Sequence, residues 1–257
     1  MHDRVNGGIA MNRLFSGALV ILFSVFILSP PTLAQEALVT DTFQTSAGDL
    51  SITFIGHASL MVKFDGKVIH IDPDSRLTDY AALPKADILL ITHEHQDHCD
   101  SKARGILTSS GTMFVTNEAC GKDVKNRIVM RNGDVKTVEG IEIRAVPAYN
   151  LVHMRSEGVP YHPKGVGNGY VIAFGDKKVY VAGDTENIPE MKNLKDIDIA
   201  FLPMNLPYTM TPDMTADAAK SFMPKILYPY HFGETDTSII LKLLDGSGID
   251  VRLRNMK

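Results

Sequence analysis

The chain has 257 residues, with 44% hydrophobic and 22% charged side chains and a formal net charge of −4 at pH 7. This composition is typical of a globular protein with a core large enough to be stable without crosslinks, and it excludes a low-complexity or collagen-like chain. The small negative charge argues against a nucleic-acid-binding protein, because such proteins gather lysine and arginine to neutralise phosphates.

The first segment, residues 1–34, has the pattern of a secretory signal peptide. Arg13 precedes an almost entirely apolar run at 14–28, and a small-residue exit ends at Ala34. The run is shorter than the ~20 residues that span a bilayer, which favours a cleaved signal over a retained membrane anchor. We therefore expect cleavage after Ala34, no stable membrane span afterwards, and a periplasmic or secreted protein. Residues 35–47 would then form a short exposed leader.

The remainder of the chain, residues 48–257, alternates short β-rich segments with a few helical ones. Apolar runs bounded by glycine, proline or aspartate predict strands, and longer runs with capping residues predict helices. The predicted strands are 50–55, 60–64, 68–71, 88–92, 135–138, 141–146, 170–173, 179–182, 199–202, 226–230 and 251–253. The predicted helices are 101–109, 117–124, 216–222 and 237–244, and 148–168 reads as a loop. Two β-rich halves, each with helices, predict two packed sheets with helices outside.

The strongest functional signal comes directly after the predicted buried strand at 88–92. Within six residues the chain carries four potential metal ligands, namely His93, His95, Asp97 and His98. A loop at a strand end can turn alternate side chains toward one point, and imidazole and carboxylate are ligands for zinc, manganese and iron. A chance histidine-rich surface loop is the competing interpretation, but this number and spacing of ligand types favours a metal site.

The His-x-His-x-Asp-His spacing resembles the signature of the metallo-β-lactamase superfamily. Later landmarks follow in the family's order: a Gly-Asp motif ends at Asp184, and a terminal histidine motif contains His231. Two earlier segments, around His57 and Asp72, resemble the family's first strands. The resemblance covers about 50–257 and implies an α/β fold, an αββα four-layer sandwich with metals at the edge between the sheets.

Within that superfamily, the chain most resembles the branch of ascorbate-6-phosphate lactonase-like proteins and other broad metal-dependent hydrolases. The matching segments are 203–205, 208–211 and 216–219. This resemblance counts against a true β-lactamase.

One landmark departs from the family pattern, in the third histidine for the first metal. Related sequences often carry it just after a Pro-Ala pair, where this chain has Asn150. The candidates are His162, which precedes a Gly-Tyr strand as the family ligand often does, and His153. If neither serves, the first site is incomplete and the enzyme holds a single metal.

With His162 as the third histidine, the resemblance implies a complete ligand set. His93, His95 and His162 would hold one metal, Asp97, His98 and His231 the other, and Asp184 would bridge them. Two divalent cations, most simply Zn²⁺ with Mn²⁺ or iron as options, would share a hydroxide that attacks a carbonyl or phosphorus centre. Asp97 and Asp184 are the expected catalytic residues. The expected function is an exported metal-dependent hydrolase acting on an ester, a lactone or a phosphodiester-type small molecule.

An alternative is a non-hydrolytic metal-binding protein or an iron redox relative on the same fold. Asn150 and the position of Cys99 beside the ligands motivate it. Cys99 could instead form a disulfide with Cys120, since exported proteins often contain disulfides, but sequence does not show whether the two are close. The sequence carries no signal of oligomeric state.

Several further residues have two interpretations each. His57 could face the substrate or pack in the core. Asp72 could support a ligand histidine, as metal-bound imidazoles usually have such a partner, or it could stabilise a turn. Tyr149, Tyr161 and Tyr208 could line a pocket or serve only in packing.

Overall fold

The computed structural model describes residues 1–3, 7–8, 38–124 and 127–257. The expected signal peptide and its cleavage site therefore lie outside the described residues, apart from a few N-terminal positions. A compact unit runs from Ala37 to Lys257. In the described segments, no helix combines the length and apolar character needed to cross a bilayer.

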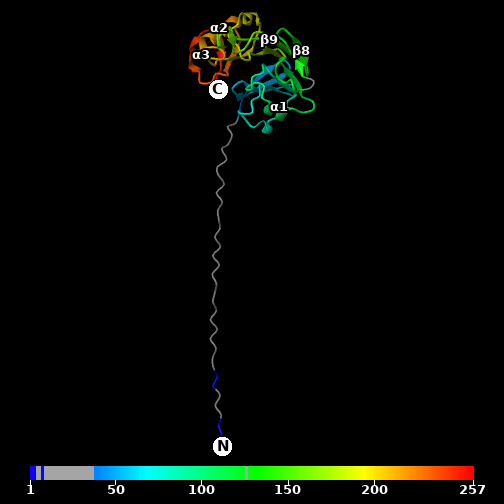
Figure 1. Ribbon diagram of the computed structural model, residues 1–257, viewed down its shortest axis with the longest axis vertical. Helices are drawn as coiled ribbons and strands as arrows, with labels where there is room; N and C mark the ends of the chain where they lie inside the picture. Colours follow the sequence, from blue (N-terminus) through cyan, green and yellow to red (C-terminus); the bar gives the residue numbers. More distant parts are fainter. Residues whose placement is uncertain (4–6, 9–37, 125–126) are drawn as a thin grey trace. The chain divides into compact units, whose positions relative to one another are not determined.

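Two seven-stranded sheets, counted over the described residues, form the centre of this unit (Figure 1). The first sheet has the order β1-β2-β3-β4-β5-β6-β7, with β1 Val39–Thr45, β2 Gly48–Gly56, β3 Ser59–Phe64, β4 Lys67–Ile71, β5 Ile88–Leu90, β6 Met113–Thr116 and β7 Ile128–Val129. The second has the order β16-β15-β14-β13-β12-β9-β8, with β8 Val135–Val138, β9 Ile141–Ala148, β12 Gly167–Phe174, β13 Lys177–Val181, β14 Ile199–Pro203, β15 Ile226–Tyr230 and β16 Asp250–Val251. A separate hairpin pairs β10 Met154–Ser156 with β11 Val159–Pro160.

Helices cover the outer face of each sheet. The first sheet is covered by the 3-10 helix η1 Tyr80–Ala82 and by α1 Ser101–Leu107. The second is covered by η2 Pro189–Asn193, α2 Pro212–Phe222 and α3 Ser238–Leu243. Figure 1 shows α1 on the opposite side of the unit from α2 and α3. The expected αββα sandwich is thereby confirmed.

The alternation of side chains along each strand explains which residues fill the layer between the sheets and which face the helices. In β2, Leu50, Ile52 and Phe54 are buried between the two sheets, while Ile55 packs on the outer face beneath α1 and η1. Successive side chains of a strand point to opposite faces, so alternation directs one set into each layer. The parallel strand β14 is buried along its whole length, which accounts for its continuous apolar sequence.

The strand directions bring distant loops to one edge of the sandwich. β4 and β5 are parallel neighbours in the first sheet, and β13, β14 and β15 are parallel neighbours in the second. Loops at the carboxyl ends of parallel strands meet at the same edge, where α/β proteins usually bind ligands. Four polar side chains follow these strands within three residues: Asp72, His93, Asp184 and His231.

The expected leader at 35–47 differs from what the structure contains. Val39–Thr45 form the edge strand β1, which pairs antiparallel with β2. The Asp41 carboxylate accepts hydrogen bonds from the Arg254 guanidinium at 2.6 and 2.8 Å and from the Tyr228 hydroxyl. These contacts with the distant end of the chain are invisible to local sequence patterns, and they extend the folded domain toward the N-terminus.

The helix expected at 117–124 is also wrong, because this segment consists of turns. Asn117 does accept a hydrogen bond from the backbone N–H of Cys120 at 2.9 Å, as a helix-capping residue would. However, Gly121 has a positive φ of 66°, which ends any helical turn. A disulfide joins Cys120 to Cys99, with the two Cα atoms 6.2 Å apart, and ties these turns to the loop of the metal motif.

Candidate metal centre

All seven predicted metal ligands lie together at the edge where the strands end. They form two groups with His57, and the ligand atoms within each group lie within 4.8 Å of one another. The first group is His93, His95, His162 and Asp184, and the second is His57, Asp97, His98 and His231. The convergence of residues from both halves of the sequence is a property of the fold.

The spacing of the ligand atoms suits a small cation. A tetrahedral zinc ion with bonds of about 2.0–2.1 Å holds its ligand atoms about 3.3 Å apart. In the first group, His95 Nδ1 lies 3.0 Å from His93 Nε2 and 3.2 Å from His162 Nε2. His162 Nε2 lies 3.3 Å from the Asp184 carboxylate. In the second group, His231 Nε2 lies 3.6 Å from the Asp97 carboxylate.

Three buried polar atoms at the centre have no hydrogen-bond partner among the described residues: His98 Nε2, His231 Nε2 and Asp184 Oδ1. Unpaired buried polar atoms cost free energy, so native proteins normally satisfy them with a partner. His98 Nε2 faces Asp184 Oδ1 at 3.4 Å, and His231 Nε2 faces Asp184 Oδ2 at 3.5 Å. These contacts are too long or too poorly aligned for hydrogen bonds, and a cation between the atoms would satisfy them.

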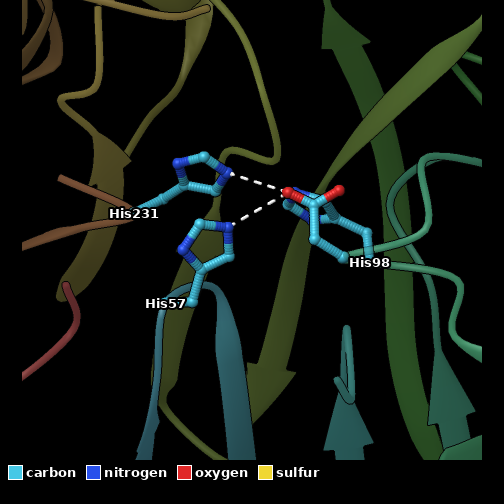
Figure 2. Close-up of side chains that lie close together, drawn as sticks. His57, His98 and His231 are labelled. Atoms are coloured by element: carbon cyan, nitrogen blue, oxygen red, sulfur yellow. Dashed lines mark hydrogen bonds and ion pairs between the residues drawn. The ribbon is translucent and has the colours of Figure 1, made fainter. Parts of the chain in front are cut away.

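His57 belongs to this cluster, a placement that the sequence left open. Its Nε2 lies 3.1 Å from the Asp97 carboxylate, and its ring lies 3.7 Å from that of His231, centroid to centroid. Figure 2 shows His57, His98 and His231 approaching one another from three separate segments of the chain. Both His57 and His231 have positive φ angles, 50° and 46°. Such backbone strain is frequent where a side chain is held for function.

Gly183 explains how Asp184 reaches the first group. The glycine has a φ of 66°, and a Cβ built there would lie 2.9 Å from the Asn168 carbonyl oxygen and 3.0 Å from Thr92 Cβ. Only glycine fits this turn, because any larger residue would collide with the segment that precedes His93. The Gly-Asp motif therefore packs directly against the His-x-His-x-Asp-His loop.

A hydrogen-bonded chain beneath the cluster orients two of the histidines. The Asp72 carboxylate accepts a hydrogen bond from His98 Nδ1 at 2.8 Å and from the Thr92 hydroxyl at 2.6 Å. Because the Thr92 hydroxyl donates to Asp72, it is free to accept from His93 Nδ1, 3.1 Å away. With a cation bound, both imidazoles would carry their proton on Nδ1 and present the Nε2 lone pair to it. Before a cation binds, Asp184 and Asp72 outweigh burial and hold the pKa of His98 well above its usual value. Asp72 thus orients a candidate ligand, His98, in addition to any role in the turn.

Asn150, the departure from the family pattern, orients His162 in the same way. Its side-chain oxygen accepts a hydrogen bond from His162 Nδ1 at 2.6 Å, and its amide donates to the buried Glu186 carboxylate at 3.0 Å. His162 is therefore held with Nε2 facing the cluster. The other candidate, His153, lies outside both groups, where its Nδ1 is 2.8 Å from the Glu186 carboxylate.

The electrostatics of the centre favour binding of a cation. Burial, with the neighbouring His98, lowers the pKa of His93 well below its usual value, so its imidazole stays neutral and able to donate a lone pair. Burial alone would raise the pKa of Asp184, but His231 and His98 outweigh burial and hold this pKa well below its usual value. The Asp184 carboxylate therefore remains ionised at the centre of the cluster.

Comparison with known proteins agrees with this arrangement. Residues 51–231 match the family model described as the β-lactamase superfamily domain. The chain belongs to the β-lactamase superfamily. It is 30% identical over 220 residues to the UPF0173 metal-dependent hydrolase of Methanopyrus kandleri, covering 79% of this chain and 95% of the relative. The recognition made from the sequence is confirmed at this level, and the protein is a metal-dependent hydrolase.

Two solved structures support the same assignment. A candidate metal-dependent hydrolase from Parabacteroides distasonis is 50% identical, with a TM-score of 0.82, covering 86% of this chain and all of the other. Igni18, a metallo hydrolase from Ignicoccus hospitalis, is 27% identical with a TM-score of 0.67, and the match covers 80% of this chain and 95% of that protein. The fold and the enzyme class thus agree with close and with distant relatives.

A cavity of about 530 Å³ opens above the centre of this hydrolase. Of the tyrosines considered from the sequence, Tyr161 and Tyr208 line it, with their rings 5.1 Å apart in an edge-to-face contact. Tyr149 does not, because it is buried and donates its hydroxyl hydrogen bond to Glu190 at 2.9 Å. The segment expected to be a loop over the site contains the β10–β11 hairpin, which supplies Arg155 to the cavity wall.

Two residues that hold the orienting side chains in place were not predicted from the sequence. Thr92 and Glu186 are fully buried polar residues adjacent to the His93 and Asp184 motifs. Their positions beside the ligand candidates were the available signal. A buried hydroxyl or carboxylate needs hydrogen-bond partners. Thr92 pairs with Asp72 and Glu186 with Asn150, the two side chains that orient candidate ligands.

Proposed function

We propose that this hydrolase holds two divalent cations, most simply Zn²⁺ with Mn²⁺ or iron as alternatives, and cleaves an ester, lactone or phosphodiester-type bond in a small molecule. The observation that carries the proposal is the position of Asp184. One carboxylate oxygen faces His162 Nε2 of the first group at 3.3 Å, and the other faces His98 Nε2 of the second at 3.4 Å.

The residues divide into roles on this basis. His93, His95 and His162 would hold one cation, Asp97, His98 and His231 the other, and Asp184 would contact both. Bound cations of this kind supply Lewis acidity and lower the pKa of water toward ~7, which provides a hydroxide nucleophile at neutral pH.

Asp97 is the second proposed catalytic residue, since it is a ligand candidate and its side chain also lines the cavity. Its side chain is 31% exposed, whereas those of Asp184 and His98 are almost fully buried. Burial would raise the pKa of Asp97, but its contacts with His231 and His57 hold this pKa well below its usual value. The ionised carboxylate would orient the attacking water, and His57 Nε2, 3.1 Å away, would receive or return its proton.

The class of scissile bond rests on the sequence features shared with lactonase-like proteins, which favour a cyclic or linear ester. The size of the cavity suits a small molecule. The two features that motivated a non-hydrolytic or redox alternative both have structural roles in this protein. Asn150 orients His162, and Cys99 is joined to Cys120. No observation in the described residues now favours that alternative.

A panel of generic esters, lactones, phosphodiesters and nitrocefin tests the proposal. Purified protein loaded with Zn²⁺ or Mn²⁺ should hydrolyse at least one of the first three classes. A chelator should abolish this activity and added metal should restore it, because the nucleophile depends on the cations. Absence of turnover for all three of these classes, or full activity in the presence of chelator, would contradict the proposal.

We also propose that the enzyme is exported, which would place its substrate in the periplasm or outside the cell. Support comes from the sequence alone: a basic residue, an apolar run of about fifteen residues and a small-residue exit before Gln35. Mass spectrometry of the protein recovered from cells should give a chain that begins at Gln35. A cytoplasmic protein that retains the whole segment would refute export while leaving the hydrolase assignment intact.

A further inference from the structure

The cavity above the metal centre contains one arginine among its lining residues. The residues that line it are His57, His95, Gln96, Asp97, Arg155, Tyr161, His162, Asp184, Asn205, Tyr208 and His231. The two acidic side chains in this set, Asp97 and Asp184, are ligand candidates whose charge cations would compensate. Arg155 lies on β10 of the β10–β11 hairpin and contacts His95, a member of the first group.

Arg155 differs from most other described arginines in having no carboxylate partner within the described residues. Arg254 lies 2.6 Å from Asp41, and Arg131 lies 2.7 Å from Glu118. The Arg155 guanidinium instead contacts His95 Nε2 at 3.4 Å and the ring of Tyr161, 5.8 Å from its centroid. A cavity guanidinium that has no carboxylate partner of its own is commonly used to bind an anionic group of a ligand.

The contact with His95 strengthens this interpretation. His95 Nδ1 faces the other histidines of the first group, so it is the atom available to a cation. A neutral imidazole that donates its Nδ1 lone pair carries its proton on Nε2. His95 Nε2 and the Arg155 guanidinium are then two hydrogen-bond donors 3.4 Å apart, and neither can accept from the other. An oxygen atom of a bound molecule would satisfy both.

We infer that the cavity selects substrates that carry an anionic oxygen group, a carboxylate or a phosphate, beside the bond to be cleaved, and that Arg155 and His95 Nε2 bind this group. The inference rests on the proposed function and narrows its substrate class. The rings of Tyr161 and Tyr208 provide an apolar wall for the rest of the molecule. A cation pair held by only two carboxylates leaves the site electropositive, which also favours an anionic substrate.

The test compares wild-type protein with Arg155→Gln and Arg155→Lys, using Arg131→Gln as a matched control at an exposed arginine outside the cavity lining. Three 4-nitrophenyl esters serve as substrates: the neutral acetate, the succinate with a free carboxylate, and an analogue with a phosphate group. Calorimetric titration of the metal-loaded proteins with succinate and with inorganic phosphate gives a readout that is independent of turnover.

In Arg155→Gln, the ratio of kcat/KM for the preferred anionic ester to that for the neutral ester should fall about 10–100-fold, the usual effect of losing a charge-assisted hydrogen bond. Binding of the matching anion should weaken by a similar factor, with partial recovery in Arg155→Lys and none of these changes in Arg131→Gln. The tighter of the two anions identifies the group.

An unchanged ratio together with unchanged anion binding in Arg155→Gln would overturn the inference. So would an equal loss for neutral and anionic esters. If wild-type protein hydrolyses none of the esters, the ester part of the proposed function is wrong, and the calorimetric comparison still decides the role of Arg155.

Discussion

Replacing Asp184 by asparagine should reduce hydrolysis by far more than about 100-fold, and the purified variant should contain less metal than wild-type protein. Loss of a residue that merely supports a ligand costs 10–100-fold, and Asp184 faces both ligand groups directly. Asparagine keeps the shape of the side chain but removes the negative charge that lies 3.3 Å from His162 Nε2 and 3.4 Å from His98 Nε2. Metal analysis and steady-state kinetics on the same preparation measure both effects.

Asp217→Asn is the matched control, because it makes the same chemical change at an exposed position on α2. This variant should keep wild-type metal content and activity. If Asp184→Asn also retained both, Asp184 could not be the residue that joins the two groups, and the proposed ligand set would be wrong.

Replacing Asp72 by asparagine should weaken metal affinity about 10–100-fold, although Asp72 touches no cation itself. The carboxylate accepts from His98 Nδ1, the Thr92 hydroxyl and the Thr92 backbone N–H. An amide can accept at only one of its two atoms, so at least one of these donors loses its partner. Where the amide nitrogen faces His98 Nδ1, the imidazole is driven to carry its proton on Nε2, the atom aimed at the cluster.

Asparagine is the appropriate substitution, because Asp72 has a φ of 44° and asparagine tolerates this left-handed conformation. Asp100→Asn is the control: this nearby carboxylate caps α1 and accepts from Ser75, but no ligand histidine is among these contacts. Competition with a chromogenic chelator measures affinity in both variants. Equal losses in the two would mean that the Asp72 variant acts only through general destabilisation.

Much of the fold and the centre could be predicted because the informative residues follow strands. The buried run before His93, and the glycine and aspartate at Gly183-Asp184, place ligands at strand ends, where parallel strands must deliver them to one edge. The resemblance to the metallo-β-lactamase superfamily, which rests on the order and spacing of these motifs, therefore implied that side chains as distant as His93 and His231 would lie at one edge.

The third histidine was harder to predict because 148–168 has no hydrophobic period. The choice between His153 and His162 depends on Glu186, which binds His153 and also the Asn150 amide that orients His162. Such a network forms only when distant segments of the chain come together, so no local sequence pattern indicates it. For the same reason the sequence did not reveal Arg155. Its proposed role depends on its place in the cavity wall and on having no carboxylate partner among the described residues.

Two predictions made from local sequence patterns were wrong because long-range contacts determine the structure of those segments. Asn117 has the chemistry of a helix cap, but Gly121 and the disulfide from Cys120 hold the following residues in turns. Residues 39–45 read as an exposed leader, but Asp41 is bound by Arg254 near the other end of the chain. In both cases the decisive partner lies outside the window that sequence periodicity samples.

The most direct test of the cation-pair centre is anomalous diffraction at the zinc absorption edge, from crystals of wild-type protein grown with Zn²⁺. Two peaks are expected, one on each side of the Asp184 carboxylate, with ligand bonds of about 2.0–2.2 Å to the histidines and aspartates of the two groups. Zinc peaks elsewhere on the protein, with none beside Asp184, would contradict a hydrolase centre built from these residues.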